Sequence, residues 1–176
     1  REPLYKVSGA KDPDLGFTIE DGAAGTAPWK GERDLVTTVC DVLNPSVARA
    51  DSSEEPGEHD ITVSVTENKN FAAELGTCTF TILPRITVKA GENGVVELTG
   101  DGLVEDMTSE GEALQGAASG TELALSAKAN EGYTFTGWTV VSGDAVISDA
   151  AAAQTTFTVG NQNVEIKANF SLSLTP

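Results

Sequence analysis

The chain has 176 residues, of which 39% are hydrophobic, so its length suits one or two domains with packed cores. It carries 27 acidic and 11 basic residues, a net charge of −16, and it clusters no Lys or Arg, so we expect neither nucleic-acid binding nor attraction to an anionic membrane. Its apolar runs are far shorter than the roughly 20 residues of a membrane-spanning helix. We therefore expect an acidic monomer with no membrane insertion.

In the first half, residues alternate between apolar and polar with a period of two. Residues 61–66 alternate Ile or Val with Thr or Ser, and residues 77–82 alternate Cys, Phe and Ile with Thr. Both segments are predicted to be strands with one face in a core and one in water, because this period matches the pleat of a strand. Threonine on the outer face also favours a strand over a helix.

A break between two units is predicted at Leu83-Pro84-Arg85. A strand ends at Ile82, proline cannot continue a central ladder, and a new strand begins at Ile86. We predict one β module at 1–84 and a second β module at 85–176. The chain begins at Arg1 without a recognisable signal peptide, so we expect it to be a segment of a longer protein.

Residues 123–129 and 163–170 again alternate between apolar and polar, which predicts two more strands in the second half. Two short segments, 110–118 and 149–154, are weak helix candidates because glycine interrupts the first and the second is very short. We expect an all-β fold with at most one short helix per module, built as two small β-sandwich or β-grasp-like modules in tandem.

Three aromatic residues lie within six positions of the second half. Tyr133 and Phe135 share one face of a strand, whereas Trp138 has the opposite parity. If all three pack together, the strand must bulge, and Gly137 is the residue that permits a bulge. With Phe157 and Phe170 they are the predicted structural core signature. The alternative is an exposed aromatic platform for a sugar, which we expect less because aromatic clusters in small β domains usually fill the core.

The two cysteines, Cys40 and Cys78, both lie in the first half. They are either two buried thiols or one disulfide formed in an oxidising compartment. Spacing alone does not decide between these alternatives, because it does not show whether the two strands are neighbours.

Nothing in the sequence points to catalysis. His59 is the single histidine, and it stands beside a turn at the start of a strand. A Gly-x-Ser-x-Gly elbow and a phosphate-binding Gly-x-x-x-x-Gly-Lys loop are both absent. Paired carboxylates are abundant, but they are expected to be solvated loop residues. We therefore expect no enzyme activity and no cofactor.

Calcium is the one exception to the expectation of no cofactor, because hard oxygen ligands on acidic, glycine-containing loops can hold Ca²⁺. The weak candidates are Asp12, Asp14, Asp51, Glu54 and Glu55, none of which belongs to an EF-hand pattern. A self-formed Lys–Asn cross-link would need a buried lysine such as Lys6, Lys89 or Lys167. Alternation places Lys167 on an outer face, and we do not expect such a bond.

The first half resembles the MBG-type repeat of bacterial surface proteins. The residues that carry this resemblance are Lys-Val-Ser-Gly-Ala-Lys-Asp-Pro-Asp-Leu at 6–15, Phe-Thr-Ile at 17–19, Pro-Gly-Glu-His-Asp-Ile-Thr-Val at 56–63, Asn-Phe at 70–71 and Thr-Phe-Thr-Ile-Leu-Pro at 79–84. His59 departs from the family pattern, which has tyrosine at that position. The resemblance covers most of residues 3–84.

The second half resembles the divergent internalin B-type repeat over residues 86–170. The matching residues are Gly-Glu-Asn-Gly-Val-Val at 91–96, Leu-Ala-Leu-Ser-Ala at 123–127, Glu-Gly-Tyr-Thr-Phe-Thr-Gly-Trp at 131–138, Thr-Phe-Thr-Val at 156–159 and Val-Glu-Ile-Lys-Ala-Asn-Phe at 164–170. The resemblance implies a small β-rich domain, often in arrays, without catalytic residues.

Together the two resemblances imply an extracellular segment of a bacterial surface protein, attached to the cell surface or cell wall through other parts of that protein. Three functions follow as expectations. The segment is a stalk or spacer, an adhesion module that binds a host glycan or protein, or an accessory domain of a secreted carbohydrate-active enzyme or peptidase. Exposed strand edges or an aromatic surface patch would favour adhesion, whereas polar, threonine-rich faces would favour the stalk.

Overall fold

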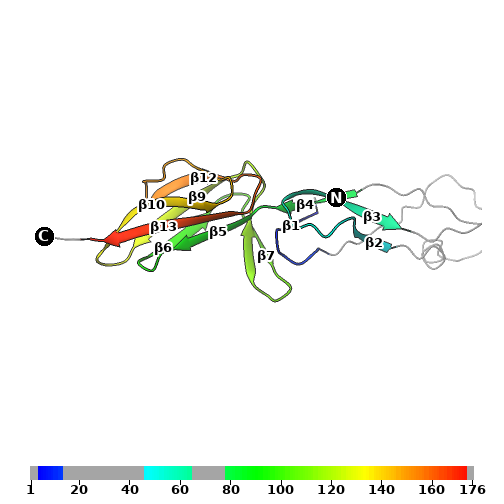
Figure 1. Cartoon of the computed structure of the whole chain (residues 1–176), viewed down its shortest axis with the longest axis horizontal. Coiled ribbons are helices and arrows are strands. Elements are labelled where there is room, and N and C mark those ends of the chain that lie inside the picture. The colour runs from blue at the N-terminus through cyan, green and yellow to red at the C-terminus, as the bar shows by residue number, and fades with distance from the viewer. Residues whose placement is uncertain (1–3, 14–45, 65–77, 174–176) are drawn as a thin grey trace, which may run out of the picture. The chain divides into compact units, whose positions relative to one another are not determined.

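The computed structural model describes residues 4–13, 46–64 and 78–173 (Figure 1). Every regular element in these ranges is a strand, which confirms the all-β class. The strands are β1 (Tyr5–Val7), β2 (Ser46–Arg49), β3 (Gly57–Ser64), β4 (Cys78–Leu83), β5 (Arg85–Ala90), β6 (Gly94–Thr99), β7 (Val104–Met107), β8 (Ala113–Gly116), β9 (Glu122–Ala129), β10 (Tyr133–Ser142), β11 (Val146–Ile147), β12 (Gln154–Thr158) and β13 (Val164–Leu172).

Two compact units can be distinguished by their internal contacts. The larger comprises residues 1–13, 53–58 and 81–176, and the smaller comprises residues 14–52 and 59–80. Within the larger unit, β1 pairs in parallel with the end of β4, with Tyr5 opposite Thr81 and Val7 opposite Leu83. Within the smaller unit, β2 pairs antiparallel with residues 61–64 of β3. The predicted division into modules 1–84 and 85–176 stays a prediction.

Two sheets in the larger unit form a β-sandwich (Figure 1). The first has five strands in the order β10-β13-β5-β8-β7, and the second has four in the order β11-β12-β9-β6. The chain crosses from the first sheet to the second at the β5–β6 turn, where the sequence Gly-Glu-Asn-Gly predicts a turn, and returns to the first sheet between β6 and β7. Only Pro84 separates β4 from β5, as expected from the break in the strand pattern.

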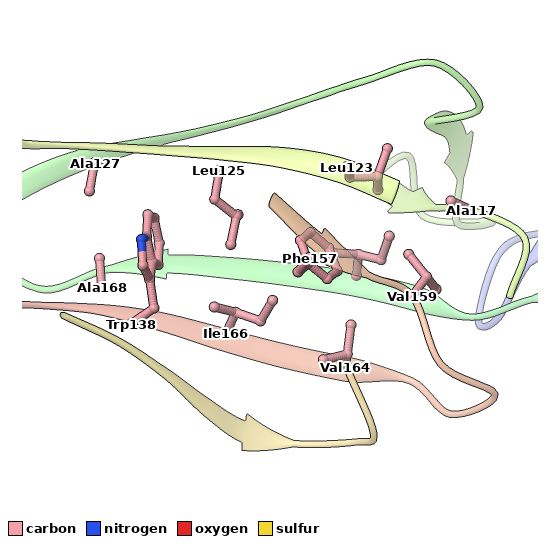
Figure 2. Packing of buried hydrophobic residues seen from close by; sticks show 11 residues of the cluster. Ala117, Leu123, Leu125, Ala127, Trp138, Phe157, Val159, Val164, Ile166 and Ala168 are labelled. Carbon is pink, nitrogen blue, oxygen red and sulfur yellow. The ribbon is translucent and has the colours of Figure 1, made fainter. Parts of the chain in front are cut away.

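The core lies between these sheets, and period-two alternation creates it. One face of β9 carries Leu123, Leu125 and Ala127, and the facing side of β13 carries Val164, Ile166 and Ala168. Figure 2 shows these side chains pointing toward one another across the interior. Phe157 of β12 is fully buried in the same cluster (Figure 2). Burial of such side chains stabilises the fold by about 1.5–3 kcal/mol each.

The two weak helix candidates were wrong. Residues 113–116 form β8, which pairs with β5 and β7, and residues 149–153 form turns that lead into β12. A physical reason lies at Gly116, where an added Cβ would stand 2.7 Å from the Pro84 carbonyl oxygen and 2.8 Å from the Val7 side chain. Glycine here permits close approach of backbones, and a glycine-containing segment of this length does not repay helix nucleation. No helix in the described residues could span a membrane.

Candidate functional site

Three aromatic residues of the predicted core signature, Phe135, Trp138 and Phe170, lie together at the β10–β13 pair. Trp138 is 5% exposed and Phe157 is completely buried, whereas Tyr133, Phe135 and Phe170 are half-buried. The ring centroid of Phe135 lies 5.4 Å from that of Trp138 and 5.8 Å from that of Phe170, distances at which aromatic pairs attract. Figure 2 shows the indole of Trp138 extending from one sheet toward the other. Its Nε1–H donates to the Ala152 carbonyl at 3.0 Å, so the buried polar atom is satisfied.

The expected bulge is present at Gly137. The register of β10 against β13 shifts between Phe135 and Gly137, and Gly137 has φ +145°. The shift turns Trp138 to the same side as Phe135, which the parity of the sequence otherwise forbids. The Trp138 N–H donates to the Ala150 carbonyl at 2.7 Å, so the loop before β12 covers this irregular point. The aromatic cluster therefore serves packing, and it offers no flat exposed platform.

A polar cluster that sequence analysis did not assemble surrounds Lys6. Its side chain is 2% exposed, although it lies on a three-residue strand. The ammonium donates to Asp12 Oδ1 at 2.6 Å, to Glu54 Oε1 at 2.7 Å and to the Ala10 carbonyl at 3.1 Å. We call Lys6, Ala10, Asp12 and Glu54 the Lys6 cluster. Its three acceptors match the three N–H groups of a lysine ammonium.

Glu54 is held at several points. Its second carboxylate oxygen, Oε2, accepts the Gly9 backbone N–H at 3.0 Å, and its backbone carbonyl accepts the Ser8 hydroxyl at 2.8 Å. Gly9 has φ +86°, a conformation that glycine adopts without strain and that aims this N–H at the carboxylate. The side chains of Asp12 and Glu54 are 45% and 44% exposed, so the cluster has a buried ammonium beneath a solvent-facing pair of carboxylates.

The same segment is tied to the strands that follow Pro84. Asn163 donates to the Ser8 hydroxyl at 2.9 Å and accepts the Arg85 backbone N–H at 2.8 Å. The Val7 N–H donates to Asp106 Oδ2 at 3.2 Å, and the Lys11 N–H donates to the Met107 carbonyl at 2.9 Å. These bonds fix β1 and the turn after it against β7 and the loop before β13.

Of the calcium candidates, Asp12 and Glu54 come together around the Lys6 ammonium. Asp51 lies elsewhere, with Oδ1 3.4 Å from His59 Nδ1, and Asp14 is outside the described residues. The Glu55 N–H donates to the Ser53 hydroxyl at 3.2 Å. In the part of the chain that the structure describes, no three His, Cys, Asp or Glu side chains are placed to hold a metal ion. Lys6 supplies a positive charge between the two carboxylates that do meet.

His59 packs against Phe80 and lies near Asp51 in the smaller unit. The centroid of its ring is 5.7 Å from that of Phe80. The guanidinium of Arg49 also lies over the Phe80 ring, 5.2 Å from the ring centroid. Arg49 Nη2 is also 3.9 Å from Asp51 Oδ1. The His59 side chain is 11% exposed, and its described neighbours are those of a packed residue.

The cysteine prediction stays open. Cys78 is exposed at the start of β4, whereas Cys40 lies outside the described residues. The disulfide between them therefore remains a prediction.

The described surface hollows are small. One of about 260 Å³ lies beside the Lys6 cluster, lined among others by Tyr5, Lys11, Asp106 and Met107. Another of about 220 Å³ lies at the β5–β6 turn beside Phe170. Both are smaller than the roughly 300–1,000 Å³ of small-molecule sites.

Asp144 organises the turn that precedes β13. Its carboxylate accepts the backbone N–H groups of Asn161 at 2.9 Å and Gln162 at 3.1 Å. These hydrogen bonds, the one from Asn161 foremost, lower the pKa of Asp144 below its usual value because they stabilise the ionised carboxylate. The residue is a turn anchor rather than an acid or base.

The outer faces of the sandwich are polar and rich in threonine. Exposed outward positions on β10 include Thr134, Thr136 and Thr139, and those on β13 include Lys167 and Ser171. Large exposed apolar side chains occur singly on different strands: Tyr5, Val95, Met107, Val141, Val146 and Leu172. Single exposed apolar residues are ordinary on a protein surface.

The comparisons with known proteins give one positive finding. A family model described as the divergent InlB B-repeat domain matches residues 85–173, about half of the chain. This range contains both sheets of the sandwich and the aromatic signature at 131–138. No curated protein and no solved structure matches the chain.

Proposed function

Because the chain belongs to the divergent InlB B-repeat family, whose members are modules of bacterial surface proteins, we propose that it is a non-catalytic, load-bearing spacer. In this role it holds another part of the protein away from the cell. Its location is extracellular, and its attachment to the surface or cell wall is made by other parts of the protein.

The observation that carries the proposal is the arrangement of the first and last strands of the repeat. β5 and β13 are parallel neighbours, with Ile86 opposite Val164 and Ala90 opposite Ala168. The chain therefore enters the five-stranded sheet at one end and leaves β13 at the other. Tension applied at the two ends slides β5 along β13, and the evenly spaced hydrogen bonds of a parallel pair share this load.

A second parallel pair lies in series with the first. β1 pairs with residues 81–83 of β4, and β4 continues through Pro84 into β5. Tension from the N-terminal side of β1 is thus also carried along the direction of the strands. Two consecutive shear contacts are what a stalk needs, whereas an antiparallel pair pulled from one end opens one hydrogen bond at a time.

The surface supports a spacer over an adhesin. The described outer faces are polar, the large exposed apolar side chains lie on different strands, with Tyr5 and Met107 lining one small hollow, and the aromatic cluster fills the core. A glycan platform needs exposed rings, and binding of a host protein usually needs a contiguous apolar patch at the centre of the interface. We find no observation that favours an accessory role in an enzyme.

The test is single-molecule force spectroscopy on the whole chain with two handle placements. Handles attached at residues 85 and 172 load the β5–β13 pair in shear. Handles at residues 133 and 172, which are cross-strand partners in the antiparallel β10–β13 pair, peel strands apart instead. Both use the same fold with Cys40 and Cys78 replaced by serine, so each is the control for the other.

We expect the shear placement to unfold at a several-fold higher force, since forced unfolding follows the unfolding rate along the pulled direction. Equal unfolding forces for the two handle placements would contradict the proposal that the β5–β13 pair carries load in shear. A glycan array and a mucin-binding assay on the same protein test the rival role. Saturable binding there would replace the pure spacer with an adhesin.

A further inference from the structure

Lys6 is the one described lysine that is both buried and in contact with two carboxylates. The other lysine ion pair among the described residues, Lys89 Nζ to Glu165 Oε2 at 2.9 Å, is at the surface, with the Lys89 side chain 55% exposed. A buried ammonium loses hydration that its partners only partly replace, so chemistry that removes the charge is favoured there. A surface ammonium stays hydrated, so removal of its charge is not favoured in this way.

We propose that Lys6 forms an intramolecular amide with Glu54. The Lys6 Nζ is 2.7 Å from Glu54 Oε1, which places it within a few ångströms of the carboxylate carbon. Reacting atoms held at about 3–3.5 Å gain most of the advantage of an intramolecular reaction. Glu54 is held there independently of Lys6 through its contacts with Ser8 and Gly9.

Two neighbouring groups, the Asp12 carboxylate and the Gly9 backbone N–H, assist different parts of the reaction. Asp12, 2.6 Å from Nζ, accepts a proton from the ammonium and transfers it to Glu54 Oε1, so that the freed lone pair attacks the carbon of a neutral carboxyl group. Glu54 Oε2 takes up negative charge in the tetrahedral intermediate, and the Gly9 N–H at 3.0 Å donates to that oxygen.

The step is balanced without an oxidant or cofactor. The Nζ–carbon bond forms and the carbon–Oε1 bond breaks. Oε1 leaves as water after it receives the proton held by Asp12 and a second proton from Nζ. Asp12 ends as a carboxylate. The half-exposed side of the cluster gives the water a route to solvent.

The product keeps the hydrogen bonds of the cluster. The remaining amide N–H still reaches the Ala10 carbonyl, now 3.1 Å from Nζ, and Oε2 still accepts the Gly9 N–H. The bond joins β1 to the segment before β3 and closes a loop from residue 6 to residue 54. Tension that enters before Lys6 would then bypass residues 7–53.

The choice of Glu54 over Asp12 as the acceptor rests on the Gly9 contact. In Glu54 the Gly9 backbone N–H donates to Oε2, the oxygen that remains after water has left. An Asp12 amide would close only the short turn from residue 6 to residue 12.

The test is the intact mass of the purified whole chain, measured in denaturant after reduction. The amide lowers the mass by about 18 Da, the mass of one water, a covalent change that charge pairing does not produce. Trypsin then distinguishes the acceptors. A Lys6–Glu54 amide blocks cleavage at Lys6 and links peptide 2–11 to peptide 50–69, whereas a Lys6–Asp12 amide links peptide 2–11 to peptide 12–30.

The expected result is the deficit of about 18 Da together with the 2–11/50–69 branched peptide, and with Lys6 inert to acetylation in denaturant. The full calculated mass with acetylated Lys6 would overturn the proposal and leave an ion cluster. A 2–11/12–30 branch would overturn the assignment of Glu54. A deficit without any branched peptide, as from a succinimide, would also overturn it.

Variants test the roles. Lys6→Met abolishes the deficit, and the matched surface variant Lys89→Met retains it. Asp12→Asn keeps both reacting groups but removes the proton carrier, so the fraction of linked protein should fall at least tenfold at a fixed time after refolding. The fluorescence of buried Trp138 reports in each case whether the sandwich is folded. Full linkage in a folded Asp12→Asn variant would contradict the role of Asp12.

Discussion

The sandwich core and the Lys6 cluster belong to one compact unit but are stabilised in different ways. The core is a set of apolar side chains from two facing sheets, centred on Phe157, Leu123 and Ile166. The Lys6 cluster is a set of charges and hydrogen bonds that fixes a three-residue strand to loops from distant parts of the sequence. Apolar burial thus supplies most of the stability, and the ionic cluster determines where the N-terminal strand is held.

The largest expected effect is in the core. Phe157→Ala removes a fully buried ring and leaves a cavity between the sheets, so the free energy of unfolding should fall by about 3–5 kcal/mol. Urea unfolding followed by Trp138 fluorescence measures it. Val146→Ala, at a side chain that is 68% exposed, is the control and should change stability by less than about 0.5 kcal/mol. A similar loss in both variants would contradict the assignment of the core.

The Lys6 cluster should show an intermediate effect. In the unlinked protein, Lys6→Met removes the ammonium that satisfies two carboxylates, and we expect a loss of about 2 kcal/mol relative to unlinked Lys6, below the value for fully buried pairs because Asp12 and Glu54 are half-exposed. Lys89→Met removes a surface pair and should cost about 0–1 kcal/mol. Chemical denaturation of both variants measures the difference, and equal losses would show that burial of Lys6 is unimportant.

Two glycines at the β5–β6 turn should differ in how much stability is lost when each is replaced by alanine. A Cβ added at Gly94 would lie 2.2 Å from the Phe170 ring, whereas one at Gly91 would meet its nearest atom at an ordinary 3.5 Å. Gly94→Ala should therefore cost about 1–3 kcal/mol through overpacking. Gly91→Ala should be neutral. Thermal unfolding of the pair measures this, and a neutral Gly94→Ala would mean that the Phe170 ring moves freely.

The smallest effect should appear only in acid. The folded-state pKa of Asp144 lies below its unfolded value of 3.8, so its contribution to stability is complete above that pH and is lost as the pH falls through the folded pKa. Asp144→Asn should be less stable than the unsubstituted protein at pH 7, with the gap in urea midpoint narrowing as the pH falls below 3.8 and through the folded pKa. A gap that does not change with falling pH would contradict the role of the ionised form of Asp144.

The difference between the sandwich core and the Lys6 cluster also explains which features could be predicted from the sequence. Strands β9 and β13 follow from alternation, and the bulge at Gly137 follows from the parity of Phe135 and Trp138. The helix at 110–118 was wrong because close packing of Gly116 against Val7, a long-range contact, overrides local preference. Such contacts leave no periodic signal in the chain.

The Lys6 cluster could not be predicted for the same reason. Asp12 and Glu54 were recognised as acidic loop residues, but nothing in the sequence indicates that Lys6 and Glu54, which are 48 positions apart, meet. The burial of Lys6 on so short a strand also runs against the usual exposure of lysine. A lysine between two apolar neighbours near an Asp-Pro turn was the available signal, and it is a weak one.

The parallel neighbours β5 and β13 also have a consequence for how such proteins change over generations. Because each repeat starts and finishes on adjacent strands of its own sheet, a whole copy can be duplicated or deleted without leaving a strand unpaired in its neighbour. A strand of nine residues spans about 30 Å. A lineage can thus lengthen or shorten such a protein in steps of about that size by recombination between copies, with no new core to be selected.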